Sequence, residues 1–155
     1  MKKFLKISGI TIAILIIIAF IGMKAMGISP LGMGMHDEII QEDGIAIGGY
    51  DPVAYFNSNE AIKGSSEFTY EWNGAKWQFS SAENMEIFKN EPDNHCPAYG
   101  GHCSFAIGKG FAAPTDPTIW SIENGKLLFY SNEEVKADAL ADIDNVISEG
   151  DKNWK

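Results

Sequence analysis

The clearest absence in this chain is arginine, because all 12 of its basic residues are lysines. Without a guanidinium group, no side chain is available to clamp a phosphate or a carboxylate through two parallel hydrogen bonds. Acids are absent before Asp37, whereas four of the lysines lie within the first 24 residues, so the other eight lysines face 21 acids. A surface this acidic repels a phosphate backbone, which argues against nucleic acid as a partner.

Cysteine is scarce, internal repeats and low-complexity tracts are missing, and the chain is short. Its 155 residues leave room for one domain and an appendage. A hydrophobic fraction of 45% is typical of a folded chain and too high for a disordered one. We therefore expect three parts: an anchor at residues 1–26, a linker at 27–43 and one folded domain at 44–155.

The anchor is predicted from a charge-free run of 17 residues, 7–23, which Lys6 and Lys24 bracket. As a helix this run would be about 25 Å long, and its flanks would extend it towards the bilayer core of about 30 Å. We therefore predict one transmembrane helix. Three lysines precede the run and one follows it, which places the domain on the periplasmic or extracytoplasmic side of the cell membrane as a single-pass protein.

A cleaved signal peptide is the alternative interpretation of the same segment. The run is not followed by a small-x-small triplet for cleavage, nor by a cysteine for lipoprotein processing. Both interpretations place the domain outside the cytoplasm.

The predicted linker contains Met33, Met35 and His36. Thioethers together with an imidazole suit Cu(I), so these three are secondary candidates for metal ligands. The alternative is that they have no role beyond filling a linker whose glycines and proline break any helix.

Within the domain, turn signals predict two β-hairpins. The strongest is Asn73-Gly74, because both residues tolerate the positive φ that a two-residue hairpin turn requires. The strands of this hairpin, and those of a second hairpin around the turn at 123–126, are predicted at residues 68–72, 76–79, 119–122 and 127–130. Short helices are expected from Ser80 or Ser81 to about Asn90, and after Asn132. The predicted fold class is therefore α+β, a small antiparallel sheet built from hairpins with flanking short helices, preceded by the transmembrane helix.

Several segments occur together in an order that matches one family. They are Gly49 to Phe56, Lys63 to Ser65, the hairpin Trp72 to Phe79, Ser80 to Asn84, Pro97 to Cys103, Asp116-Pro117, Trp120 and Trp154. Over about residues 45–155 the chain resembles the YHS domain family in its longer bacterial form. The resemblance implies a small α+β fold. It also implies transition-metal binding, since shorter relatives occur beside heavy-metal transport ATPases and other metal-handling proteins.

Residues 95–103 hold both cysteines and two of the three histidines. Cys103 is the cysteine that the resemblance leads us to expect, whereas His95, Cys96 and His102 replace aromatic or aliphatic residues. Three interpretations stay open. The four side chains form a site for Zn²⁺, Cu(I) or iron; Cys96 and Cys103 form a disulfide, contributing about 2 kcal/mol; or the segment carries no chemistry.

We therefore predict a membrane-tethered, extracytoplasmic YHS-like domain that binds a transition metal, with copper favoured over zinc. The alternative is a disulfide-stapled, non-catalytic binding or interaction module without metal. An enzyme is not expected, because no oxyanion or substrate motif accompanies the Cys-His pairs. Thiol chemistry at Cys96 and Cys103 stays open, as do metal-handling proteins as partners.

Overall fold

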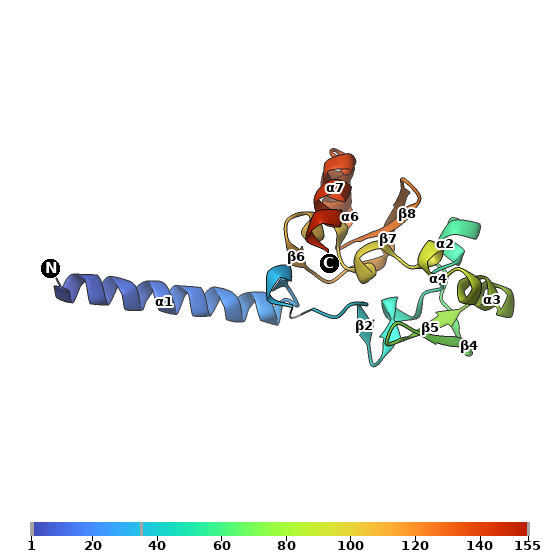
Figure 1. The fold of residues 1–155 in the computed structure, drawn as a ribbon, viewed down its shortest axis with the longest axis horizontal. Helices are drawn as coiled ribbons and strands as arrows, with labels where there is room; N and C mark the ends of the chain where they lie inside the picture. Colours follow the sequence, from blue (N-terminus) through green and yellow to red (C-terminus); the bar gives the residue numbers. More distant parts are fainter. Residues whose placement is uncertain (1, 35, 155) are drawn as a thin grey trace.

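The computed structural model describes residues 2–34 and 36–154, and their side chains from residue 11 onward (Figure 1). The chain begins with a long helix, α1 (Lys2–Ala25), which projects away from the rest of the fold. After it, β1 (Ser29–Pro30) pairs with β6 (Phe111–Ala112). Part of the segment predicted as a linker is therefore hydrogen-bonded to the domain.

The structure corrects the prediction for the N-terminal segment. Within the part of the chain that the structure describes, no helix is both long enough and apolar enough to cross a membrane. The transmembrane helix predicted within residues 1–26 is therefore wrong. The extracytoplasmic location was inferred from the same segment and stays a prediction.

The domain is α+β with several sheets, so the single antiparallel sheet that we predicted is also wrong. Its remaining strands are β2 (Gln41–Glu42), β3 (Ile45–Ala46), β4 (Ser65–Trp72), β5 (Ala75–Phe79), β7 (Asp116–Glu123) and β8 (Lys126–Tyr130). One sheet has the order β2-β3-β5-β4, with a parallel pairing between β3 and β5, and β7 and β8 form a separate antiparallel pair. The two predicted hairpins are both present, but each belongs to a different sheet.

Short helices connect and cover these strands. They are α2 (Ala54–Asn57), α3 (Ala82–Asn90), α4 (Pro92–His95), α5 (Ser104–Gly108), α6 (Glu133–Leu140) and α7 (Ile143–Asn153), with 3-10 turns at Leu31–Met33, Ile47–Gly49 and Ala98–Gly101. The Ser81 hydroxyl accepts the Asn84 N–H at the start of α3, and the Asn132 side chain accepts the Val135 N–H at the start of α6. Both helices thus begin where a side chain satisfies a backbone donor that the helix leaves unpaired.

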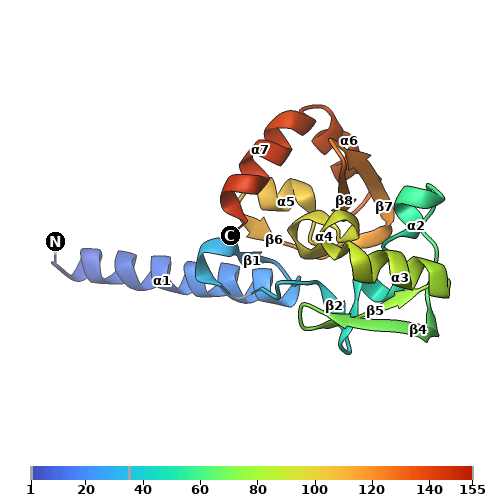
Figure 2. The same ribbon diagram turned by 45° about the vertical axis from the view of Figure 1, so that its right-hand side comes forward.

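Strand β8 lies between two hydrophobic cores. Leu127 and Phe129 pack into the core that also contains Trp77 and the rest of the first hairpin. Leu128 and Tyr130 pack into the second core, against α5 and α7. Because successive strand residues point to opposite faces, one strand serves both cores. Figure 2 shows the result, with α6 and α7 on one side of the β7–β8 pair and the first hairpin on the other.

Candidate functional site

The structure places the four side chains that the sequence predicted as metal ligands in different surroundings. His95 ends α4, where its Nδ1 lies 3.0 Å from the Glu91 carbonyl oxygen and its ring packs edge-on against Phe56. Cys96 follows and is half-buried at the wall of a cleft. Cys103, with 1% of its surface exposed, lies beside β8 in the interior.

No group of three or more His, Cys, Asp or Glu side chains suited to a metal ion occurs among the described residues. The four predicted ligands therefore do not form a preassembled site, although metal binding itself stays a prediction. Of the secondary candidates, Met33 is 59% exposed, and Met35 lies outside the described residues.

Both cysteines are free thiols in the structure, so the alternative of a Cys96–Cys103 disulfide is not the form seen here. The chain between them turns sharply, because Tyr99, Gly100 and Gly101 all have positive φ. This turn leaves Cys96 at the cleft and carries Cys103 into the interior.

Burial, followed by the nearby Asp93 carboxylate, raises the pKa of Cys96 to about 12. The thiol therefore stays protonated at neutral pH. A protonated thiol is a poor nucleophile and a poor metal ligand, so Cys96 lacks the activation that thiol chemistry requires.

This pKa predicts slow alkylation of Cys96. At pH 8 its thiolate fraction should be about 1000-fold below that of an ordinary thiol, because each pKa unit is a factor of ten. We expect iodoacetamide, followed by mass spectrometry, to label Cys96 of a Cys103→Ser variant at least 100-fold more slowly in the folded chain than in urea. Equal rates in the two states would contradict the buried, protonated thiol.

The structure brings together three residues from separate parts of the chain: His36, His102 and Trp154, here called the imidazole cluster. The ring centres of the two histidines lie 6.1 Å apart, with their planes nearly perpendicular at 85°. Trp154 packs against both rings, at 5.1 Å from His36 and 5.6 Å from His102. It follows the last turn of α7 and donates its backbone N–H to the Gly150 carbonyl.

Hydrogen bonding defines the tautomer of His102. Its Nε2 lies 2.9 Å from the Asp37 carbonyl oxygen, which can only accept, so Nε2 carries the proton. The Nδ1 atoms of His102 and of His36 are buried and have no hydrogen-bond partner among the described residues. Unpartnered buried nitrogens are uncommon in folded proteins, and each one calls for an explanation.

Burial lowers the pKa of His102, and it outweighs the raising effects of the Asp37 and Ala113 backbone. The Nδ1 atom of the ring has no hydrogen-bond partner among the described residues. His102 is only 7% exposed. Its ring is therefore neutral at neutral pH, with a lone pair on Nδ1.

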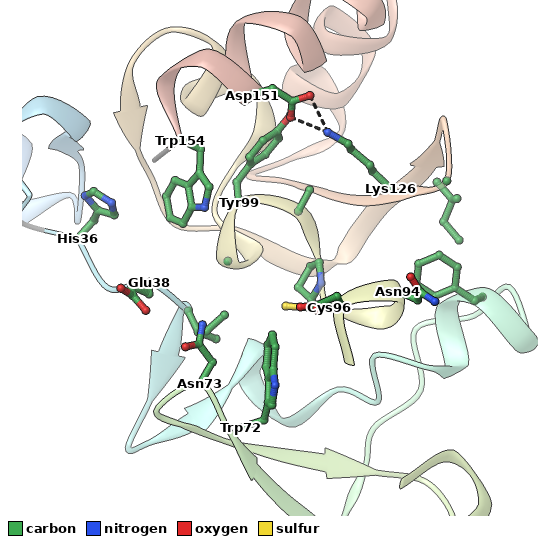
Figure 3. A pocket seen from close by; sticks show the side chains of 18 residues that line it. His36, Glu38, Trp72, Asn73, Asn94, Cys96, Tyr99, Lys126, Asp151 and Trp154 are labelled. Carbon is green, nitrogen blue, oxygen red and sulfur yellow. Dashed lines mark hydrogen bonds and ion pairs between the residues drawn. The ribbon is translucent and has the colours of Figure 1, made fainter. Parts of the chain in front are cut away.

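A cleft of about 840 Å³ adjoins the imidazole cluster, which contributes His36 and Trp154 to its wall (Figure 3). Tyr99 lines the same cleft, and its hydroxyl is hydrogen-bonded to the Ile147 carbonyl and to Asp151. Burial, followed by the contact with Asp151, raises the pKa of Tyr99, so its phenol stays protonated.

Comparisons with protein families, with characterised proteins and with solved structures find no match to this chain. The resemblance to the YHS family therefore stays a prediction from the sequence motifs.

Sequence reasoning selected His36 and His102 separately, one as a linker residue and one as part of the His-Cys segment. It missed their proximity, because no local pattern links positions so far apart. Trp154 was noted as a motif residue near the C-terminus. Its contact with the two histidines could not be predicted from the sequence.

Proposed function

We propose that this chain is a YHS-like domain that binds a transition metal, with copper favoured, and that His36 and His102 are the ligands. The observation that carries the proposal is the pair of buried, unpartnered Nδ1 atoms on two adjacent imidazoles. A metal ion is a partner that would satisfy both nitrogens.

The hydrogen bond of His102 supports a role as ligand. In metalloproteins a ligating histidine usually donates its other ring N–H to a carboxylate or a backbone carbonyl, which fixes the tautomer. His102 has this arrangement, because Nε2 donates to the Asp37 carbonyl while Nδ1 keeps its lone pair.

The spacing of the rings also supports the proposal. With a metal–nitrogen bond of about 2 Å and about 1.1 Å from each nitrogen to its ring centre, imidazoles on opposite sides of one ion have centres about 6 Å apart. The observed separation is 6.1 Å. The separation of the ring centres is therefore compatible with two imidazole ligands on one ion.

The number of ligands favours Cu(I). Structural Zn²⁺ sites are almost always four-coordinate, and the described residues offer no cluster of three or more His, Cys, Asp or Glu side chains. Cu(I) accepts two nitrogen ligands in a line. Trp154 covers both rings and would limit access of water to the ion.

The test is an anaerobic Cu(I) titration of the full chain against a competing chelator. We expect one Cu(I) per chain, and an affinity at least about 100-fold lower in His36→Phe and in His102→Phe, because each variant removes one of two ligands. His95→Phe is the matched control and should bind as the natural chain does.

Two outcomes would contradict the proposal. One is unchanged binding in both cluster variants, and the other is loss of binding in His95→Phe or Cys96→Ser while the cluster variants still bind. The second outcome would favour the His-Cys set predicted from the sequence. Circular dichroism of each variant establishes that the chain is folded before affinities are compared.

A further inference from the structure

The cleft beside the imidazole cluster has aromatic walls on opposite sides. Figure 3 shows Trp154 and Tyr99 on one side of the cleft and Trp72 on the other, with Glu38 at a third side. Trp154 follows α7 and Tyr99 lies in the 98–101 turn. Trp72 is the last residue of β4, and Glu38 precedes β2. The two indoles have no lysine stacked over them among the described cation–π contacts, which involve Tyr50, Tyr70, Phe105 and Tyr99.

The charges that line the cleft are mainly negative. Glu38, Asp93 and Asp151 contribute carboxylates, and Lys126 is the one lysine among the lining residues. Lys126 is paired with Asp151, whereas Glu38 and Asp93 take part in none of the ion pairs found in the described part of the chain. The cleft thus has an excess of negative charge beside half-buried indole rings.

Lys126 shows how this cleft accommodates an ammonium group. Its Nζ lies 2.5 and 2.7 Å from the two Asp151 oxygens, and 5.9 Å from the centre of the Tyr99 ring. One carboxylate and one aromatic face therefore already hold a cation of the chain itself. The same combination, Glu38 with Trp72 and Trp154, is left for a cation from outside.

We propose that the cleft, which Trp154 also lines, binds a small organic cation, with a methylated or primary ammonium against the Trp72 indole and its charge facing Glu38. A ring face attracts a cation through its quadrupole, and tryptophan does so most strongly. The volume of about 840 Å³ lies in the range typical of small-molecule sites. This site uses different chemistry from the metal site, since its ligand contributes charge and shape and no lone pair.

The test compares choline with 3,3-dimethylbutanol, which has the same shape without the charge. Both are titrated into the full chain at low salt with a metal chelator present, and the indole N–H signals and tryptophan fluorescence are followed. We expect saturable choline binding and an affinity for the neutral compound lower by about tenfold. Equal binding of the two compounds, or no saturable change with choline, would overturn the proposal.

Variants locate the site. Glu38→Gln removes one exposed carboxylate and should weaken choline binding about threefold at low salt, whereas Glu134→Gln, an equivalent change on α6, should have no effect. Trp72→Phe keeps a ring packed against Trp77 and Phe88 but presents a weaker quadrupole, so we expect a loss of about fivefold. Choline binding that is unchanged in both Glu38→Gln and Trp72→Phe would place the cation elsewhere and refute the assignment.

Discussion

Replacement of Asp51 by alanine is expected to lower the free energy of unfolding of the domain by about 4 kcal/mol. The Asp51 carboxylate is 0% exposed, and it accepts hydrogen bonds from three parts of the fold. One oxygen accepts the N–H groups of Val53 and Ala54, and the other accepts the Ser80 N–H, the Ser80 hydroxyl and the Asn84 amide, at 2.6 to 3.3 Å.

The expected cost follows from these donors. Alanine leaves the N–H groups of Val53 and Ala54 buried without an acceptor, at roughly 1–3 kcal/mol for each group, and it leaves the donors of Ser80 and Asn84 to partial rescue by water. Even with partial rescue by water, a loss of about 4 kcal/mol is expected, against a total stability of about 5–15 kcal/mol for a domain. Urea unfolding followed by tryptophan fluorescence measures the change.

Asp116 provides the matched control, because it also precedes a proline. Its carboxylate is exposed and serves only Thr118, through the backbone N–H and the hydroxyl. Asp116→Ala is therefore expected to cost less than about 1 kcal/mol, since water replaces the carboxylate at an exposed turn. Similar losses in the two variants would refute the role of Asp51 as a buried hydrogen-bonding centre.

Replacement of Gly100 by alanine is expected to destabilise the domain and to abolish the proposed copper binding. Gly100 has a φ of +61°, and a Cβ added there would lie 1.8 Å from the Glu38 carbonyl oxygen. The segment around Glu38 would have to move away. That segment is held by the bond from the Ile40 N–H to the Gly100 carbonyl, and it carries His36 and the Asp37 carbonyl that orients His102.

The size of this effect has two sources. A side chain in the left-handed region costs about 1–2 kcal/mol, and displacement of a packed segment adds a further loss, so about 3 kcal/mol or more is expected. Gly74→Ala is the control, because Gly74 has a φ of +75° but nothing within 4 Å of its added Cβ. It should lose only the strain energy and should keep Cu(I) affinity, which thermal unfolding and the chelator titration together measure. Full copper binding in a folded Gly100→Ala chain would contradict this prediction. It would mean that copper binding does not depend on the position of residues 36–40.

Local features of the structure could be read from the sequence where short-range chemistry decides them. Asn73 and Gly74 have φ of 49° and 75°, and Asn124 and Gly125 have 51° and 77°, which is the geometry that a two-residue hairpin turn needs. Helix α3 ends at Asn90, before Pro92, as predicted. Each of these features depends on neighbours within a few residues, so their residue types were sufficient.

The prediction of one sheet was wrong for a reason that local signals cannot supply. Strand β8 is buried on both faces, and its alternate side chains enter two different cores. The pattern Leu127-Leu128-Phe129-Tyr130 indicates a strand, but it does not say which element covers each face. The separation of the two hairpins into different sheets depends on how α5 and α7 pack against that strand.

By itself, the sequence determined the acidic character of the chain, its hairpin turns, its helix starts and the residue types capable of binding a soft metal. The tertiary structure alone decided which of those residues meet. It moved Cys103 into the interior and Cys96 to a cleft, and it placed His36 against His102 beneath Trp154. The physical reason is that turns and caps are stabilised by neighbours along the chain, whereas the imidazole cluster depends on a glycine turn and a C-terminal helix that pack together only in the complete fold.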